Sequence, residues 1–265
     1  MKKPAVSIIV ATLNEGKYIG SLMRSLEKQT FSDFEVVVVD GGSKDKTLEE
    51  TRSYRLRTRI FVIKGGREYY SKDFASKKAE GDILLFTNAD SVFPPNLIEK
   101  VYSKFQQNKE LIVVTGPHIL YDGPAVGKVE YYALYAFRYL TYKSRYAFHS
   151  GGSFFAVRKK HFEKVGGFGL EAIDADGVPQ TKIAEIYGFR RVEFSPSTFV
   201  YVSARRMEKM GFLSSNIFYF SWCWGILLPR FIRWHPIVSN LIRKSSDRLK
   251  RKHLEMHKIV GNSHK

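Results

Sequence analysis

The 265-residue sequence contains a single cysteine, Cys223, which rules out an internal disulfide bond. A lone thiol indicates a reducing compartment or no redox role. The sequence also lacks internal repeats and low-complexity tracts, and the apolar run near its start is too short for the core of a signal peptide. These absences favour a globular protein, and the length allows one large domain or a domain with an extension.

Two phosphate-binding signatures are also missing. The loop after the first strand-like run, Thr12 to Glu15, contains neither the P-loop pattern nor the Gly-x-Gly-x-x-Gly fingerprint. Their absence argues against a P-loop nucleotide hydrolase and against a dinucleotide-binding Rossmann site.

Acidic residues are scarce toward the C-terminus. From residue 201 onward there are 13 lysines and arginines against 3 acidic residues, which accounts for about +10 of the net charge of +17. A basic segment of this kind suits anionic lipid, nucleic acid or solubility, and charge alone does not choose among them.

Apolar runs typical of buried strands alternate with segments of helical periodicity. Because strands that alternate with helices form βαβ units, the pattern predicts an α/β fold with a Rossmann-like, mostly parallel central sheet flanked by helices. The strand-like runs are residues 6–11, 35–40, 60–63, 83–87 and 111–115, and the helical segments include residues 19–26 and 68–79.

Polar residues follow three of these runs at the point where each strand ends. They are Thr12, Asn14 and Glu15 after the first run, Asp40 after the second, and Asn88 and Asp90 after the fourth. Parallel strands deliver such residues to one edge of a sheet, where ligands bind, and carboxylates there can hold Mg²⁺ or Mn²⁺ on a substrate phosphate. Taken alone, residues 88–90 read equally well as an Asx turn.

Three segments in this order resemble the family 2 glycosyltransferases, which have the GT-A fold. They are residues 6–15, residues 29–47 and residues 81–90, and the resemblance extends over about residues 4–205. It implies a GT-A glycosyltransferase domain over residues 1–205, followed by a basic, aromatic-rich helical extension over residues 206–265.

The resemblance also implies a nucleotide-sugar site. The residues that match its motifs are Thr12, Asn14, Glu15, Asp40, Gly42, Lys72, Asn88, Ala89 and Asp90. Lys72 stands where the family often has an arginine, and Asn88 replaces the first aspartate of the metal-binding motif. An amide still bonds a ribose hydroxyl but carries no charge, so Asp90 is the one carboxylate there expected to hold Mg²⁺ or Mn²⁺.

On the acceptor side, Gly151 and Gly152 belong to a glycine-rich segment that would let an acceptor approach the backbone, or that simply makes a tight connection into a strand. Arg205 and Arg206 close the family-like region. Their guanidinium groups suit a diphosphate or an acceptor phosphate, and the alternative is an exposed basic helix start.

An inverting transfer to a hydroxyl also needs a general base. Asp176 is the candidate, with Asp174 as the second choice, and either one could instead be the N-cap of a helix. The segment departs from the family pattern at Ala175 and Pro179. An acceptor that is already an ionised phosphate needs no strong base.

Residues 211–229 contain no charged side chain, and basic residues follow at once. This pattern favours a monotopic anchor on an anionic membrane surface over a buried helix or a full span. It predicts a peripheral or monotopic protein at the cytoplasmic face of the cell membrane, or a cytoplasmic one if the extension is only core. The aromatic residues of 131–142 would line the acceptor side, extend the membrane face or belong to the core.

The expected function is therefore an inverting, metal-dependent glycosyltransferase of the hexosyltransferase type. It would move a sugar from a UDP- or GDP-sugar to a lipid-linked acceptor of the polyprenyl-phosphate type or to another glycan acceptor, for example a glycan of the cell envelope. One rival is a sugar-phosphate nucleotidyltransferase, which would need a glycine-rich basic loop after the first strand. The other is a nucleic-acid-binding protein, but no recognition motif is present, so nucleic acid is not an expected partner.

Overall fold

The structure is a computed structural model that describes residues 2–65, 68–145, 152–168, 178–205 and 207. The chain divides into two units, residues 1–209 and 210–265, and every described residue lies in the first. Several predictions fall outside the described residues. They concern Asp174, Asp176, Gly151, Arg206 and the segment 211–229.

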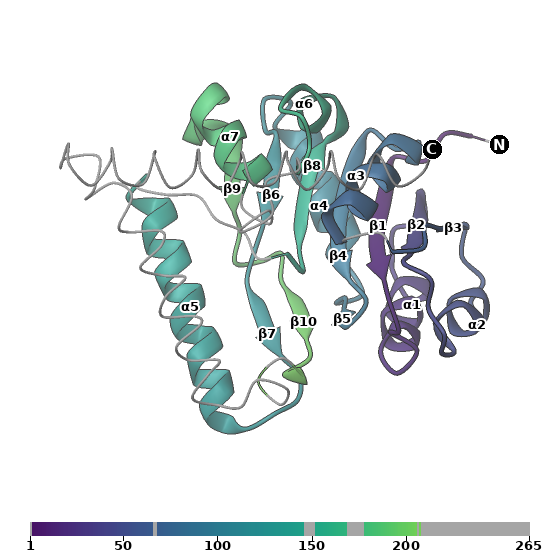
Figure 1. Ribbon diagram of the computed structural model, residues 1–265. Helices are drawn as coiled ribbons and strands as arrows, with labels where there is room; N and C mark the ends of the chain where they lie inside the picture. The colour runs from purple at the N-terminus through teal and green to yellow at the C-terminus, as the bar shows by residue number, and fades with distance from the viewer. Residues whose placement is uncertain (1, 66–67, 146–151, 169–177, 206, 208–265) are drawn as a thin grey trace, which may run out of the picture. The chain divides into compact units, whose positions relative to one another are not determined.

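A seven-stranded sheet forms the centre of the fold, in the order β3-β2-β1-β4-β8-β6-β9 (Figure 1). The pairings β1–β2, β1–β4, β2–β3 and β6–β9 are parallel, whereas β8 runs antiparallel to both of its neighbours. The strands are β1 (Val6–Thr12), β2 (Phe34–Asp40), β3 (Thr58–Val62), β4 (Ile83–Asn88), β6 (Val113–Thr115), β8 (Phe155–Arg158) and β9 (Val192–Phe194).

Helices cover both faces of this sheet, which makes a three-layer α/β fold. Side chains of α1 (Ile19–Glu27) and α4 (Leu97–Gln107) pack in the core on one face. Side chains of α3 (Glu68–Lys78), α6 (Lys159–Lys164) and α7 (Val178–Tyr187) pack in the core on the other. The short helix α2 (Thr47–Arg52) follows β2, and a 3₁₀ turn, Phe189–Arg191, leads into β9.

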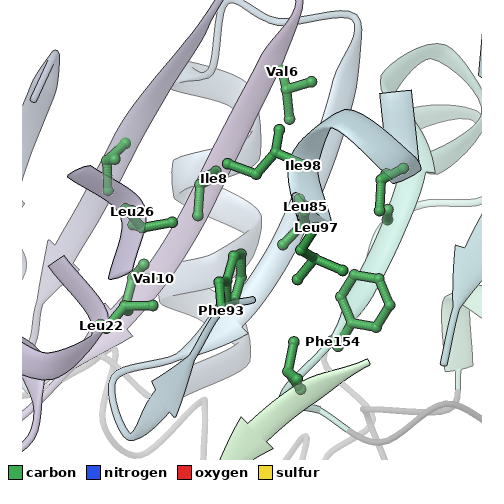
Figure 2. Packing of buried hydrophobic residues seen from close by; sticks show 14 of the residues in the cluster. Val6, Ile8, Val10, Leu22, Leu26, Leu85, Phe93, Leu97, Ile98 and Phe154 are labelled. Carbon is green, nitrogen blue, oxygen red and sulfur yellow. The ribbon is translucent and has the colours of Figure 1, made fainter. Parts of the chain in front are cut away.

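The strands are apolar at consecutive positions because both of their faces are buried. In β1, Val6, Ile8 and Val10 belong to the core shared with α1 and α4, whereas Ile9 belongs to the opposite core. Figure 2 shows Val6, Ile8 and Val10 among Leu22 and Leu26 of α1 and Leu97 and Ile98 of α4. All of these side chains are at most 1% exposed, which identifies β1 as the centre of the core.

A second, three-stranded sheet extends from the end of the first. It consists of β5 (Ser91–Val92), β10 (Val200–Val202) and β7 (His118–Leu120), with β10 in the middle. The long helix α5 (Ala125–Lys143) follows β7 and runs along one side of the fold (Figure 1). Within the residues that the structure describes, none of the helices is both long enough and apolar enough to cross a bilayer.

The expected architecture is confirmed. Each of the five predicted strands is present, with ends that differ by one or two residues, and the helical segments 19–26 and 68–79 correspond to α1 and α3. The antiparallel insertion of β8 between β4 and β6 had no signal in the sequence, because an apolar run does not reveal the direction of its neighbours.

Candidate functional site

The tips of three adjacent strands bring the predicted donor-site residues together. In the parallel register, Thr12 of β1 lies opposite Asp40 of β2, and Ala11 lies opposite Asn88 of β4. Asp90 follows in the turn directly after β4. The residues that share this edge come from positions up to about 80 apart in the chain, and the sheet places them side by side.

Asp40 is fully buried and organises the loop that follows its strand. Its Oδ2 accepts the backbone N–H groups of Gly42 at 2.9 Å and Ser43 at 2.8 Å, and its Oδ1 accepts the hydroxyls of Thr12 at 3.1 Å and Ser43 at 2.5 Å. Gly42 has a φ of +97°, a conformation that a side chain would strain. With four donors already bound, Asp40 fixes the shape of the loop, and a direct contact with a nucleotide stays a prediction.

The loops after β1 and β2 are tied to each other through side chains. Ser43 Oγ accepts the N–H of Asn14 at 2.8 Å, and Asn14 Oδ1 accepts the N–H of Lys44 at 2.9 Å. Thr47 Oγ1 accepts the N–H of Glu15 at 2.8 Å. Asn14 has a φ of +55°, which asparagine tolerates better than most residues. These bonds fix the backbone of Glu15 and aim its carboxylate toward the strand tips.

Arg205 joins Glu15 and Asp90 across this edge. Its Nε donates to Asp90 Oδ2 at 2.7 Å, its Nη1 pairs with Glu15 Oε2, and its guanidinium lies 4.8 Å from the ring centroid of Tyr18. All three ion-pair partners are largely buried, with side chains at most 20% exposed. Burial alone lowers the pKa of Arg205, but the hydrogen bond to Glu15 and the charge of Asp90 outweigh it and raise the pKa above its ordinary value.

The other oxygen of Asp90 bears on the predicted metal. Asp90 Oδ1 is buried and accepts no hydrogen bond from any residue that the structure describes. A buried carboxylate oxygen left unpaired is costly, and a bound cation would satisfy it. Over the described ranges there is no cluster of three or more His, Cys, Asp or Glu side chains. Since Mg²⁺ is often held by one or two carboxylates together with substrate phosphates, a single Asp90 oxygen fits this type of site.

Lys72 lies behind the tip of β4. Its ammonium is buried and donates to Glu68 Oε1 at 2.6 Å and to Asn88 Oδ1 at 3.1 Å, and Asn88 Nδ2 in turn donates to Ser153 Oγ at 3.3 Å. The turn that contains Gly152 and Ser153 is held to β4 as well, because Ser153 O accepts the hydroxyl of Thr87 at 2.9 Å. Lys72, Asn88 and Gly152 therefore belong to one connected region.

A second turn holds the segment that carries Arg205. Asp122, between β7 and α5, accepts the hydroxyl of Ser203 at 2.9 Å and the N–H of Ala204 at 2.5 Å. Gly123 has a φ of +83°, and a Cβ atom there would lie 2.4 Å from the Cβ of Ala204. The two turns are thus in close contact, and the position of Arg205 depends on Asp122.

The structure brings most of the predicted residues together at one edge of the sheet, where their contacts differ. Thr12, Asn14, Glu15, Asp40, Gly42, Lys72, Asn88, Asp90, Gly152 and Arg205 all lie there. Ala89 lies there too, but its side chain is in the hydrophobic core, so only its backbone could meet a ligand.

Sequence reasoning did not identify Tyr18, Ser43, Asp122 and Ser153 as parts of this region. Asp122 and Gly123 form an Asp-Gly pair, which signals a turn. That signal does not name the distant residues that the turn contacts.

In open α/β sheets, ligands bind beyond the carboxyl ends of the strands, which is where these carboxylates and Arg205 lie. The chain belongs to glycosyl transferase family 2, whose profile matches residues 7–166.

Among similar proteins, the glycosyltransferase GlyG of Streptococcus pneumoniae is 30% identical over 122 residues, covering 44% of this chain and 40% of GlyG. The poly(ribitol-phosphate) beta-N-acetylglucosaminyltransferase TarS of Staphylococcus aureus is 41% identical over 90 residues, covering 32% of this chain and 16% of TarS. The matches thus span less than half the length of these relatives.

Two solved structures share the fold. The mannosyltransferase PcManGT from Pyrobaculum calidifontis, in complex with GDP-Man and Mn²⁺, aligns with a TM-score of 0.59 at 24% identity, over 77% of this chain and 58% of that one. TarS residues 1–349 in complex with UDP-GlcNAc align with a TM-score of 0.54 at 19% identity, over 76% and 58%. The fold of this chain is therefore GT-A.

Proposed function

We propose that this protein transfers a sugar from a UDP- or GDP-sugar to a lipid-linked or other glycan acceptor, with inversion at the anomeric carbon. The observation that carries the proposal is the joining of Glu15 and Asp90 by Arg205, with one oxygen of Asp90 left unpaired at the strand tips. Family membership supports sugar transfer, and the complexes of PcManGT with GDP-Man and of TarS with UDP-GlcNAc support nucleotide-sugars as donors.

The proposed donor site uses the residues of this edge in distinct ways. Thr12, Asn14 and Glu15 face the nucleobase and ribose, and Asp40 with Gly42 keeps their loop in shape. Asn88, oriented by Lys72, offers its amide to a ribose hydroxyl. The backbone of Ala89 completes the turn beside it.

The diphosphate would be stabilised by positive charge. Asp90 would hold Mg²⁺ or Mn²⁺ through Oδ1, and the metal, when bound, neutralises charge on the phosphate oxygens. Arg205 would bind the same phosphates, and the position of its guanidinium beside Asp90 supports this role. Hydrogen-bond donors fixed before the reaction stabilise developing charge without reorganisation.

The acceptor side rests on residues that lie mostly outside the described ranges. We propose Asp176 as the base that takes the acceptor proton, with Gly151 and Gly152 bordering the acceptor and Arg206 binding its phosphate or the leaving group. We also propose that residues 206–265 anchor the protein as a monotopic extension on an anionic membrane at its cytoplasmic face.

The proposal is tested by thermal-shift screening of the full chain against UDP- and GDP-sugars with Mn²⁺, followed by product analysis with polyprenyl-phosphate acceptors. A donor should raise the melting temperature only with the metal, and chelation should abolish transfer. Asp90→Ala should remove both effects, while Asp82→Ala, an exposed aspartate just before the same strand, should keep them. Wild-type transfer by Asp90→Ala in excess Mn²⁺ would contradict the metal assignment.

The base is tested separately. Asp176→Asn should lower transfer to a hydroxyl acceptor by about 100-fold or more without changing the donor-induced thermal shift. Full activity on such an acceptor would remove Asp176 from the mechanism.

A further inference from the structure

The two sides of helix α5 have different environments. On its inner side, Tyr131 packs against one hydrophobic core, and the rings of Tyr135 and Tyr139 lie 5.8 and 6.2 Å from Phe194 in the other. The outer face of α5 consists of Val126, Val129, Tyr132, Ala133, Ala136 and Leu140, all of which are exposed. Figure 1 shows α5 running along one side of the fold.

The outer face is a continuous apolar stripe. Positions 129, 133, 136 and 140 follow one another at intervals of three and four residues, which places their side chains in one row along the helix. Val129 and Leu140 are each 66% exposed and Tyr132 is 56% exposed. Large apolar side chains that are exposed as a contiguous patch, unlike scattered ones, indicate a surface that binds a partner or a membrane.

The charges on the helix select the partner. All 19 residues of α5 lie within the described ranges, and the exposed ones outside the outer face are Ala125, Lys128 and Lys143, none of which is acidic. Glu130 is the only acidic residue of the helix, and both of its carboxylate oxygens are buried. The apolar stripe is therefore bordered by positive charge alone, as in helices that lie on anionic lipid.

We infer that the outer face of α5 lies on the surface of an anionic bilayer. Its six apolar residues insert at the level of the lipid headgroups, and Lys128 and Lys143 reach the lipid phosphates beside them. The stripe spans most of the helix, which at 1.5 Å per residue is about 28 Å long.

Other occupants fit the charges less well. In an antiparallel pair of α5 helices, Lys128 of one copy would face Lys143 of the other, with no exposed carboxylate on the helix to balance them. The chain from residue 201 onward carries 13 basic against 3 acidic residues, so as a whole it offers few carboxylates to balance Lys128 and Lys143. An anionic membrane surface accommodates both the apolar stripe and the two lysines beside it.

This contact has a consequence for the proposed transfer, and that consequence rests on the proposed function. The turn that leads into α5 contains Asp122, which holds Ser203 and Ala204 beside Arg205. A helix lying on the bilayer would therefore bring the phosphate-binding end of the donor site close to the lipid headgroups, where a lipid-linked acceptor presents its phosphate.

A probe on the outer face tests the contact in the full chain. Leu140→Cys in a Cys223→Ser background is labelled with an environment-sensitive nitrobenzoxadiazole group and mixed with phosphatidylcholine vesicles that contain phosphatidylglycerol. We expect blue-shifted emission and quenching by spin-labelled lipid. The same label at Ile186→Cys, which is 62% exposed on α7, should keep its aqueous emission and serves as the control.

A charge variant tests the contribution to binding. The double substitution Val129→Glu and Leu140→Glu should lower the partition coefficient onto these vesicles by about tenfold or more, whereas Ile186→Glu should leave it unchanged. The donor-induced thermal shift should be the same in the wild type, the double variant and Ile186→Glu. A failure of the proposed function would therefore be seen separately from a failure of the lipid contact.

Three results would overturn the inference. One is aqueous emission from the label at position 140, either because the protein binds the vesicles with this position in water or because it does not bind them at all. Another is blue-shifted emission without vesicles, which would show that another part of the chain covers the outer face. The third is a dimer in solution that the two glutamate substitutions dissociate.

Discussion

The guanidinium of Arg205 donates to Asp90 at 2.7 Å and also pairs with Glu15, 190 residues away in the sequence. One arginine thus pairs with both carboxylates that are expected to meet the donor and its metal, and it balances only one of their two negative charges. A cation bound at Asp90 Oδ1 would lie close to the guanidinium on Oδ2, so the positive charge of Arg205 would oppose its binding.

Arg205→Gln should separate the two roles of this residue. Without the positive charge of the guanidinium on Oδ2, a cation at Oδ1 of Asp90 meets less repulsion, so the affinity for Mn²⁺ alone should rise in a calorimetric titration. Transfer should fall by about 100-fold, because a charge-stabilising group at the diphosphate is lost. Arg205→Lys should recover little, since one ammonium cannot span both carboxylates.

Arg24→Gln, a change of an exposed arginine on α1, provides the matched control for this experiment. An unchanged Mn²⁺ affinity in Arg205→Gln would show that Arg205 and the metal do not share Asp90.

Asp122→Asn should disturb Arg205 without touching the donor. The amide can accept from Ser203 or from the backbone of Ala204 but no longer satisfies both as a carboxylate does. We expect kcat/KM to fall by about tenfold, and Ser203→Ala to have a smaller effect because it removes one neutral hydrogen bond.

A double-mutant cycle identifies the route of this effect. If Asp122 acts by positioning Arg205, Asp122→Asn should cost nothing further in an Arg205→Gln background. Additive losses in the double variant would mean that Asp122 acts elsewhere.

Glu35 should matter for folding rather than for activity. Its carboxylate is fully buried on β2, where it accepts from Ser7 Oγ and Glu80 N–H at 2.6 Å each and pairs with Arg59 at 2.6 Å. Glu35→Ala leaves these donors without a partner and should lower the free energy of unfolding by about 3 kcal/mol in urea denaturation. Asp33→Ala breaks only the exposed pair with Lys2 and should cost less than about 0.5 kcal/mol.

His118 should make the stability of the fold depend on pH. Burial lowers its pKa to about 3, and the nearby charge of Arg138 acts in the same direction. Since an unfolded histidine titrates near a pKa of about 6.5, the unfolded chain binds a proton between these two values that the folded chain does not. The stability that neutral His118 contributes to the folded state is therefore fully present above about pH 6.5. It is lost as the pH falls below this value, by about 1.4 kcal/mol per pH unit.

The comparison of wild type with His118→Gln isolates the pH-dependent stability that comes from His118. Between pH 7 and pH 5, the free energy of unfolding of the wild type should fall by about 2 kcal/mol more than that of the variant. Between pH 8 and pH 7 the two proteins should change in parallel. An equal loss in both proteins down to pH 5 would assign the pH dependence to other groups.

The sequence alone determined the architecture and the edge where the site lies. Consecutive apolar residues in β1, β2 and β4 are a local signal of strands buried on both faces, and the polar residues that follow them mark the strand ends. Such patterns can be recognised from neighbouring residues alone, so the α/β fold and the grouping of Thr12, Asp40 and Asn88 could be predicted.

Only the tertiary structure decided how these residues are connected. The saturation of Asp40 by Ser43, the ion pairs of Arg205 and the support from Asp122 join parts of the chain that no periodicity links. The aromatic positions of α5 show the same limit: the sequence left core and membrane face open, and the fold buries Tyr131, Tyr135 and Tyr139 in part while leaving Val129, Tyr132 and Leu140 in solvent. A helix with apolar residues on more than one face has no defined inner side until other elements pack against it, and that packing depends on long-range contacts that the sequence does not display.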